Sequence, residues 1–451
     1  MTTNPATGAR LRSYRGDSRR RVDAALGRSE AAFGSWRALP PSRRAAALRR
    51  LAAALRRRRG ALARLATDEM GKPLAESLAE VDKCRLACLH FARHGARFLR
   101  DERPPGAPRG SRVVFQPLGP VLAVMPWNFP FWQLFRAAAP ALMAGNTMVL
   151  KHAPNVTGCA LAIGRLFREA RVPRGVLEVI VVENKAVGAV IADRRVAAVT
   201  LTGSVRAGMA VGAQAGAALK KAVLELGGSD AYVVLADADV PRAAATCAAS
   251  RLINAGQTCI SAKRFIVVRP VLARFERELT ERMAERRLGS PLDPSTRLGP
   301  LARADLLENL DRQVRASVRK GARVLLGGRR VPGAGFFYPP TVLAGVRPGM
   351  PAYHEELFGP VAAIIPARDE ADAVRIANDS DFGLGAAVFT RSRAAARRVA
   401  AALEAGCVFA NDLVRSDPAL PFGGVKRSGH GRELGPQGIR EFVNVKTVVG
   451  A

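Results

Sequence analysis

The chain has 451 residues, of which 48% are hydrophobic and 24% are charged, and its formal net charge is +32. The length allows two or three hydrophobic cores, and the apolar content favours a folded, soluble protein over a disordered one. No apolar run approaches the roughly 18 residues that a membrane-spanning helix needs. The N-terminus lacks the apolar core of a secretory signal, and six scattered cysteines fit a reducing compartment, so we expect a cytoplasmic protein.

Most of the excess positive charge is arginine, and much of it lies in the N-terminal region. In segment 42–60, Leu48, Leu51 and Leu55 recur at helical spacing, which leaves the arginines on the opposite, solvated face. No aromatic residue interrupts this segment to stack on a base. We therefore interpret the charge as a solvated surface and expect neither a specific nucleic acid nor a membrane as partner; binding to a polyanion is the alternative.

The expected elements follow one another in a regular order along the chain. Residues 17–100 have the apolar spacing of successive amphipathic helices, and the Pro- and Gly-rich segment 100–110 ends them. Short strands are expected over 111–125, and strands and helices then alternate from 134 to 235, which is typical of a parallel sheet covered by helices. A second α/β region follows, with strands expected at 231–236, 264–269, 323–328, 362–367, 385–390 and, at the end of the chain, 441–451.

Three polar residues have the chemistry of one reaction. Cys259 ends the small turn Gly-Gln-Thr-Cys, which we expect to be flexible and to present a thiolate to a carbonyl carbon. Glu225, 34 residues earlier, follows an apolar run that should desolvate it and raise its pKa toward that of a useful base. Asn128, between two prolines, can donate its side-chain N–H to an oxyanion together with the Cys259 N–H. Together these groups can oxidise an aldehyde through a thioester, whereas each alone also fits a structural role.

Two further features fit a nucleotide site. The run 202–208 ends an expected strand and opens a helix, where glycines let a pyrophosphate approach the helix N-terminus. Lys151 ends another expected strand and should face the crevice in which nucleotides bind. The structural alternatives are glycines that serve packing and a surface lysine.

A metal site is not expected. Cys84 and Cys88 share one face of an expected helix, while His90 and His94 share another, so the four side chains cannot converge on one ion.

Six motifs together resemble the aldehyde dehydrogenase superfamily, and the resemblance covers nearly the whole chain. They occur in the family's order and spacing: PWNFP at 126–130, TGSVRAG at 202–208, LELGG at 224–228, GQTC at 256–259, EELFGPV at 355–361 and PFGGVKRSG at 421–429. The resemblance implies that Cys259 is the nucleophile, that Glu225 activates water for deacylation and that Asn128 donates to the oxyanion. It implies NAD or NADP as cofactor, held by Trp127, Lys151, Thr202, Gly203, Ser204, Gly208, Leu226, Glu356 and Phe358.

The choice between the two cofactors stays open. NAD-preferring relatives often carry a glutamate three residues after the lysine that corresponds to Lys151, where it repels a 2′-phosphate. Pro154 stands there in this chain, so we expect that NADP is at least tolerated.

The resemblance also implies a fold and an assembly. The expected fold is α/β and aldehyde dehydrogenase-like, with a Rossmann-like nucleotide-binding domain over 1–97 and 118–227. The resemblance also implies an α/β catalytic domain over 228–442, with a C-terminal return helix. A small β oligomerisation element at 98–117 and 443–451 completes the expected fold. A homodimer or homotetramer is expected.

The finer resemblance is to bacterial succinate-semialdehyde dehydrogenases. Arg136, eight residues after Asn128, is placed where that subgroup positions an arginine on the substrate carboxylate, and Ser416 can add a hydroxyl. A surface arginine is the structural alternative. We expect oxidation of succinate semialdehyde to succinate; the alternatives are a broad-specificity aliphatic aldehyde dehydrogenase and a nucleic-acid-binding protein on a dehydrogenase scaffold.

Overall fold

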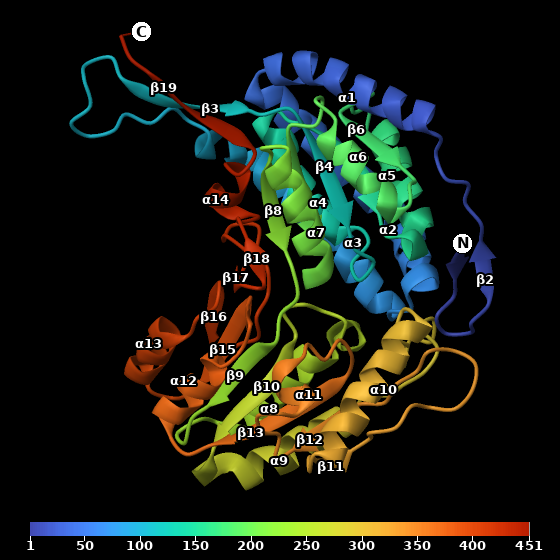
Figure 1. Ribbon diagram of the computed structural model, residues 1–451, viewed down its shortest axis with the longest axis vertical. Helices are drawn as coiled ribbons and strands as arrows, with labels where there is room; N and C mark the ends of the chain where they lie inside the picture. The colour runs from blue at the N-terminus through green and yellow to red at the C-terminus, as the bar shows by residue number, and fades with distance from the viewer. Residues whose placement is uncertain (451) are drawn as a thin grey trace.

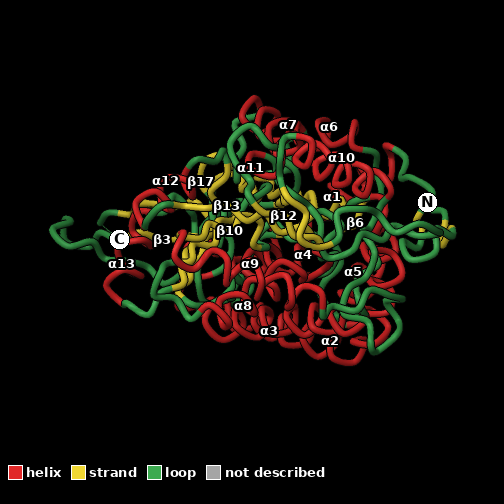
Figure 2. Tube along the Cα trace, turned by 90° about the horizontal axis from the view of Figure 1, so that it is seen from below, coloured by secondary structure: helices red, strands yellow, loops and turns green. Residues whose placement is uncertain are grey.

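The computed structural model describes residues 1–450 and is built on two large sheets. Figure 1 shows the first sheet and the N-terminal helices in the upper part of the molecule and the second sheet below them. In the perpendicular view of Figure 2, the strands form a central layer with helices on both sides. Ala451, the last residue of the predicted oligomerisation element, lies outside the described residues.

Three long helices open the fold, as the leucine spacing predicts: α1 Arg19–Ala38, α2 Pro41–Met70 and α3 Leu74–Phe98. Helix α2 begins at Pro41, whose fixed φ suits the first helical position, and ends at Gly71, whose φ of 90° is the left-handed conformation of a helix end. Leu48, Leu51 and Leu55 are buried, so the apolar face of α2 packs inward.

The first sheet has the strand order β18-β8-β7-β4-β5-β6. Its parallel strands are β4 Pro120–Met125, β5 Thr147–His152, β6 Leu177–Ile180, β7 Ala198–Thr202 and β8 Lys221–Glu225, and β18 Gly429–His430 is antiparallel to β8. Its helices are α4 Trp132–Ala144, α5 Thr157–Glu169, α6 Val187–Ala192 and α7 Val205–Ala217. Parallel strands place all their carboxyl ends at one edge, so Lys151, Thr202 and Glu225 lie along the same rim.

The second sheet has the strand order β11-β12-β13-β10-β9-β15-β16 and is parallel except for β11. Its strands are β9 Asp230–Val234, β10 Ala262–Val268, β11 Arg323–Leu326, β12 Thr341–Ala344, β13 Val361–Ala367, β15 Gly385–Phe389 and β16 Cys407–Ala410. Its helices are α8 Val240–Leu252, α9 Arg269–Ala284, α10 Ala304–Arg319, α11 Pro351–His354, α12 Glu370–Asn378 and α13 Arg393–Ala402. The sequence prediction did not include β12 and β16.

Two distant segments form an arm that projects from the body of the protein (Figure 1). Strand β3 Arg112–Pro117 pairs antiparallel with β19 Val443–Val448 over six residues. Val445 on β19 is 60% exposed, so the arm presents apolar surface to solvent. The oligomerisation role of this arm and the domain boundaries stay predictions.

The remaining elements are short. They are β1 Thr2–Thr3, β2 Arg10–Arg12, β14 Phe382–Gly383, β17 Val425–Lys426, α14 Gly435–Ile439 and the 3₁₀ turns Pro154–Val156, Asn184–Ala186 and Ile253–Gly256. Helix α14, the last of the described chain, packs against α3 and α4. No helix within residues 1–450 is both long and apolar enough to cross a bilayer.

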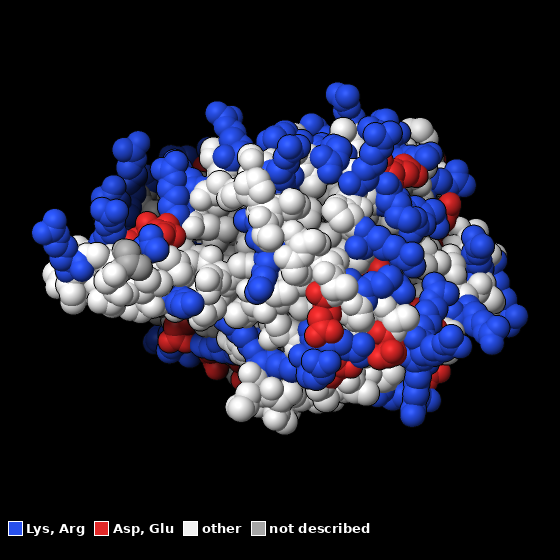
Figure 3. Space-filling view, turned by 90° about the horizontal axis from the view of Figure 1, so that it is seen from above, with Lys and Arg blue, Asp and Glu red and all other residues white. Residues whose placement is uncertain are grey.

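The basic side chains are dispersed over the surface. In Figure 3, many Lys and Arg side chains and few acidic groups stand on the visible face, around a wide uncharged area. Several arginines of the N-terminal helices are paired with acids, for example Arg58 with Glu169 and Arg59 with Asp82. This distribution fits a solvated surface.

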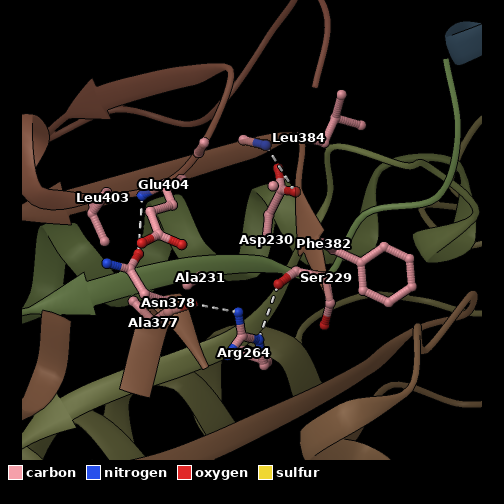
Figure 4. A pocket seen from close by; sticks show the side chains of 14 residues that line it. Ser229, Asp230, Ala231, Arg264, Ala377, Asn378, Phe382, Leu384, Leu403 and Glu404 are labelled. Atoms are coloured by element: carbon pink, nitrogen blue, oxygen red, sulfur yellow. Dashed lines mark hydrogen bonds between the residues drawn. The ribbon is translucent and has the colours of Figure 1, made fainter. Parts of the chain in front are cut away.

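A small polar pocket lies inside the second sheet (Figure 4). Arg264 donates to the carbonyls of Ser229, Ile376 and Ala377 at 2.9–3.0 Å, and Asp230 accepts from the Gly385 N–H at 3.1 Å. The cavity measures about 10 Å³, which is room for about one water molecule. It therefore serves as a structural polar network and not as a ligand site.

Candidate active site

Two cavities meet at Cys259. The larger one, about 610 Å³, lies at the carboxyl edge of the first sheet, and the smaller one, about 260 Å³, lies between α3, α4 and the segment before β17. Cys259 is the one residue of the described chain that lines both. Cavities of roughly 300–1,000 Å³ are usual for small ligands, so the larger cavity suits a large molecule and the smaller cavity a small one.

The turn before Cys259 is tightly packed. Asn254, Ala255 and Gly256 all have positive φ, and a Cβ on Gly256 would lie 2.2 Å from the carbonyl oxygen of Gly359. Gln257 is fully buried, and its side chain accepts from the Ala302 N–H at 2.8 Å. Burial and hydrogen bonds, and not the flexibility that we predicted, therefore fix where the sulfur points.

A buried lysine, Lys263, stabilises the turn that carries Cys259. Lys263 Nζ on β10 donates to the carbonyls of Thr258 at 3.0 Å and Cys259 at 2.7 Å and lies 3.5 Å from the Glu356 carboxylate. Glu356 in turn accepts from the Gly228 N–H at 3.0 Å. The sequence prediction missed Lys263, although a lysine inside the apolar run of β10 was a signal for a buried ammonium with a structural task.

The surroundings of Cys259 favour the protonated thiol over the thiolate. Burial raises the pKa of Cys259 to about 12, against the lowering effect of the nearby Arg136 and Lys263 cations, and Glu225 and Glu356 raise it further. The thiol therefore needs either a proton acceptor or a change in its surroundings before it attacks.

Glu225 is buried without a hydrogen-bond partner in the described chain. Its side chain is 1% exposed, and burial raises the pKa of its carboxyl well above the usual value, against the lowering effect of Arg136. This agrees with the direction that the sequence predicts. Glu225 lines neither cavity; a Cβ on Gly423 would lie 2.8 Å from its carboxylate, so that glycine makes room for it.

The two glycines after Glu225 serve close packing. A Cβ on Gly227 would lie 2.5 Å from the Glu356 carboxylate, and one on Gly228 would lie 2.6 Å from the Cys259 carbonyl oxygen. Small residues are therefore required where β8 passes the nucleophile turn.

Arg136 is an ion-paired, buried cation. Its guanidinium pairs with Glu433 and donates to the Thr202 hydroxyl at 3.0 Å, and both charged side chains are almost fully buried. It also lies 4.8 Å from the centroid of the Phe422 ring. Arg136 lines the smaller cavity as predicted, but it has a carboxylate partner within the protein. Glu433 was missed, and no motif of the sequence pointed to it.

Asn128 is held by three hydrogen bonds in the wall of the larger cavity. Its amide nitrogen donates to the Gln257 carbonyl at 3.0 Å, and its amide oxygen accepts from the Phe129 N–H and the Gln133 side chain, both at 3.2 Å. These bonds fix the amide so that its nitrogen faces the turn that carries Cys259.

Seven of the nine predicted cofactor residues line the larger cavity: Trp127, Thr202, Gly203, Ser204, Leu226, Glu356 and Phe358. Ser204 caps α7 by accepting from the Ala207 N–H at 3.3 Å, so the positive end of the α7 dipole opens onto this cavity. Trp127 and Phe358 form an edge-to-face pair with centroids 5.8 Å apart. A helix N-terminus beside an aromatic wall fits a dinucleotide with its pyrophosphate and its flat ring.

The other two predicted cofactor residues, Lys151 and Gly208, do not line the larger cavity. Lys151 Nζ donates to the Asn184 side chain at 2.5 Å, and Asn184 lines the cavity in its place. A Cβ on Gly208 would lie 2.4 Å from Leu226, so Gly208 lets α7 pack closely against that residue. Asn184 was missed because the turn before α6 carries no recognisable pattern.

The smaller cavity has an apolar lining with a few charged groups. Phe129, Trp132 and Phe422 contribute aromatic walls, and Lys83 and Ser416, 2.8 Å apart, lie at one side. No group of three or more His, Cys, Asp and Glu side chains within residues 1–450 is placed to hold a metal ion.

Comparisons with known proteins agree with this geometry. The model of the family described as "Aldehyde dehydrogenase family" matches residues 1–448. The chain is 50% identical over 386 residues to the succinate semialdehyde dehydrogenase [NAD(P)+] of Escherichia coli K12, which covers 86% of this chain and 84% of that protein. It is 44% identical over 450 residues to succinate-semialdehyde dehydrogenase [NADP(+)] 1 of Mycobacterium tuberculosis, which covers 99% of this chain and 98% of that protein.

A solved structure is also closely similar. The crystal structure of succinic semialdehyde dehydrogenase from Streptococcus pyogenes in complex with NADP+ superimposes with a TM-score of 0.96 at 38% identity. The match covers 99% of this chain and 98% of that one.

Proposed function

Because the chain belongs to the aldehyde dehydrogenase family, we propose that it oxidises succinate semialdehyde to succinate through a thioester on Cys259. The chain is an NAD(P)-dependent aldehyde dehydrogenase with the fold of that family. The observation that carries the finer proposal is the position of Cys259 at the junction of a dinucleotide-sized cavity and a small, cation-bearing one. A substrate bound in the smaller cavity thereby reaches the nucleophile from the side opposite the cofactor.

The thiol of Cys259 adds to the aldehyde carbon, and its proton leaves to a base or to solvent. The developing oxyanion accepts from the Asn128 amide and from the Cys259 N–H. NAD or NADP, held in the larger cavity by residues such as Trp127, Ser204 and Phe358, would supply the hydride acceptor, and loss of a hydride from this carbon leaves a thioester on Cys259. Glu225, kept basic by burial, then takes a proton from water, and the hydroxide releases the acid and restores the thiol.

A carboxylate on the substrate is supported by the charges of the smaller cavity. Its lining carries three cations, Lys83, Arg136 and Arg415, and two acids, of which Glu80 is paired with Lys72 and Glu76 has its pKa raised to about 7 by burial. Arg136 is paired with Glu433, whereas Lys83 has no ion pair within residues 1–450 and donates to the Ser416 hydroxyl. The distal carboxylate of succinate semialdehyde complements the positive charge that remains, and a neutral aldehyde does not. The names of the similar proteins from Escherichia coli and Mycobacterium tuberculosis support the same substrate.

Both cofactors are accepted in this proposal. Pro154, at the position where a glutamate would repel a 2′-phosphate, is exposed and uncharged. Lys151 lies at the end of the adjacent strand. We also propose that the β3–β19 arm joins subunits into a homodimer or homotetramer, because its exposed strands and Val445 offer an unpaired, apolar edge.

The substrate is tested with the purified wild-type protein and two aldehydes of equal length, succinate semialdehyde and butanal, each with NAD and with NADP. Reduced cofactor is followed at 340 nm. We expect kcat/KM for succinate semialdehyde to exceed that for butanal by at least about tenfold, as a charged hydrogen bond in a desolvated site provides. Equal values would favour the broad-specificity aliphatic enzyme.

A further inference from the structure

We propose that Lys263 is a positioning residue of the oxyanion site: its buried ammonium holds the Thr258–Cys259 peptide so that the N–H of Cys259 is presented to the substrate oxygen. This inference rests on the proposed function, because the oxyanion forms only if Cys259 adds to an aldehyde, but it does not depend on which aldehyde is oxidised. Lys263 lines neither cavity, so it acts through this peptide and not on the substrate.

Lys263 is a buried cation whose hydrogen bonds within the described chain all go to the backbone around Cys259. Its side chain on β10 is 1% exposed. Its Nζ donates to the carbonyls of Thr258 at 3.0 Å, Cys259 at 2.7 Å and Ser261 at 3.3 Å, and the Glu356 carboxylate lies 3.5 Å away. An ammonium has three N–H donors and a neutral amine only two, so three carbonyls and a carboxylate favour the charged form. The buried charge is compensated only while the chain around Cys259 keeps this shape.

The other buried charges beside Lys263 have different contacts. Arg251 is fully buried and donates to the Gly256 carbonyl at 2.6 Å, so it holds the beginning of the turn. Asp230 belongs to the small polar pocket of the second sheet. Lys263 is the side chain of the described residues that donates to the Thr258 carbonyl. The orientation of the peptide between Thr258 and the nucleophile therefore depends on this lysine.

A trans peptide converts this contact into an orientation of the N–H. The C=O of one residue and the N–H of the next point in opposite directions across a planar trans peptide, so the Cys259 N–H points away from Lys263 when the Thr258 carbonyl points toward it. This N–H donates to no backbone carbonyl within residues 1–450, which leaves it for a ligand. The Thr258 carbonyl also accepts from the Ser261 N–H at 3.2 Å. Two donors on one carbonyl polarise the peptide and make its N–H a stronger donor.

The same ammonium also acts on the sulfur, and the two effects can be separated. Burial raises the pKa of Cys259 to about 12, and the Arg136 and Lys263 cations lower it in part. Alkylation of the sulfur by iodoacetamide needs the thiolate but forms no oxyanion, whereas addition to an aldehyde needs the thiolate and forms an oxyanion. The ratio of the rates of these two reactions therefore reports on the oxyanion site alone.

The test compares two rate constants at one pH in wild type and in Lys263→Met. The first is the single-turnover formation of reduced cofactor at 340 nm, with saturating NAD or NADP and with the better substrate of succinate semialdehyde and butanal. The second is alkylation by iodoacetamide without cofactor or aldehyde, followed by the mass of the peptide that carries Cys259. We expect the ratio of the first to the second to fall about 10- to 100-fold in Lys263→Met, because loss of a whole oxyanion donor costs roughly 100- to 1,000-fold and a misplaced donor keeps part of its effect.

Two further variants frame this result. Lys263→Gln keeps a neutral N–H donor on a shorter side chain, so it should recover part of the ratio. The matched control is Lys426→Met. Lys426 also donates to two carbonyls, those of Asn378 and Ser380, and pairs with Glu404, but it is exposed and lines neither cavity. Its ratio should equal that of wild type.

A wild-type ratio in a folded Lys263→Met protein would overturn the inference. Equal falls of both rates would show that the ammonium acts only on the thiol, and two unchanged rates would show that it only supports the fold. If Lys263→Met does not fold, Lys263→Gln decides: its ratio should lie at least about threefold below that of wild type, and a wild-type ratio would overturn the inference. Equal oxidation of succinate semialdehyde and butanal by the wild type would contradict the proposed substrate alone, and the ratio measured with either aldehyde would still support or overturn the role of Lys263.

Discussion

The two cavities that share Cys259 are built in different ways. The larger one is lined mainly by short segments at the rim of the first sheet, with the N-terminus of α7 among them, and is closed by residues of α10 and the segment after α11. The smaller one is assembled from side chains far apart in the chain, on α3, on α4, at the nucleophile turn and in the segment after β16. Strand-end segments therefore form most of one cavity, and side chains that only the fold brings together form the other.

This difference separates the common chemistry from the choice of substrate. A helix N-terminus can bind phosphate and an aromatic wall can bind a flat ring whatever the aldehyde is. A wall made of a few side chains depends on which charge is free, and Lys83 and Arg136 differ in that respect. Changes in the larger cavity should alter cofactor use, changes in the smaller cavity should alter aldehyde preference, and changes at Cys259 should abolish both half-reactions.

The largest effect is expected for Cys259→Ala. Turnover of every aldehyde should fall by roughly 10⁴-fold or more, because the covalent step has no other nucleophile. Cofactor affinity, measured by fluorescence titration with NADPH, should stay within about threefold of wild type. Residual turnover within tenfold of wild type would show that the shared residue of the two cavities is not the nucleophile.

Glu225→Gln should separate the half-reactions. Hydride transfer precedes hydrolysis, so stopped flow at 340 nm should show a burst of about one reduced cofactor per site, and a steady state slower by roughly 100- to 10,000-fold. In wild type the hydrolysis rate should be lost as the pH falls through the raised pKa of Glu225, because the base works only when ionised. A variant that turns over at the wild-type rate would make Glu225 structural.

Arg136→Ala should affect all aldehydes alike. It leaves Glu433 as a buried, uncompensated charge and removes the cation that acts on Glu225 and Cys259. Unfolding in urea should show a loss of about 3–5 kcal/mol, and kcat/KM for succinate semialdehyde and butanal should fall together, by roughly 10- to 100-fold. Glu433→Gln in the same chain should recover part of the stability. A loss confined to succinate semialdehyde would return carboxylate binding to Arg136.

Pro154→Glu tests whether a change beside the larger cavity alters cofactor preference alone. A carboxylate placed after β5 should repel the 2′-phosphate of NADP by about 1–2 kcal/mol, or roughly tenfold in the NADP/NAD ratio of kcat/KM. The ratio between the two aldehydes should not move. Pro154→Gln is the neutral control, and an unchanged cofactor ratio in Pro154→Glu would place the adenine ribose elsewhere.

The sequence could predict the features that depend on neighbouring residues, but not those that depend on distant segments. The helices, the two α/β regions and the strand-end motifs depend on local spacing, so Leu48 in its helix and Ser204 at its turn could be placed from neighbours in the sequence. The partners of buried charges depend on distant segments, and Arg136 with Glu433 joins α4 to the segment after β18. Lys83 fits the charged face of an amphipathic helix equally well, and only the packing of α3 against Trp132 and Ser416 shows that it lines the smaller cavity.

The smallest expected effect is a pH dependence of aldehyde preference. Burial lowers the pKa of Lys83 to about 8, helped by the Arg136 cation, while Cys84, Asp417 and Glu80 raise it in part. Lys83 is charged below this pKa, so the preference for succinate semialdehyde should be complete below about pH 7 and should decline as the pH rises through 8. At pH 9 only about 10% of such a lysine is protonated, which predicts a roughly tenfold lower ratio of the two kcat/KM values.

Between pH 8 and 9.5 the ratio reports mainly on Lys83. Cys259 and Glu225 act on both aldehydes, so their titrations cancel, and Glu76 of the same lining, with a pKa of about 7, is already mostly ionised. The carboxylate of succinate semialdehyde stays ionised over this whole range. Within it, Lys83→Met should give a low ratio that does not change with pH, and Lys83→Arg should give a constant one, since a guanidinium keeps its charge. A wild-type ratio that is constant between pH 8 and 9.5 would mean that the ammonium of Lys83 does not select the substrate. The preference would then come from Arg136, which shares the cavity and is paired with Glu433.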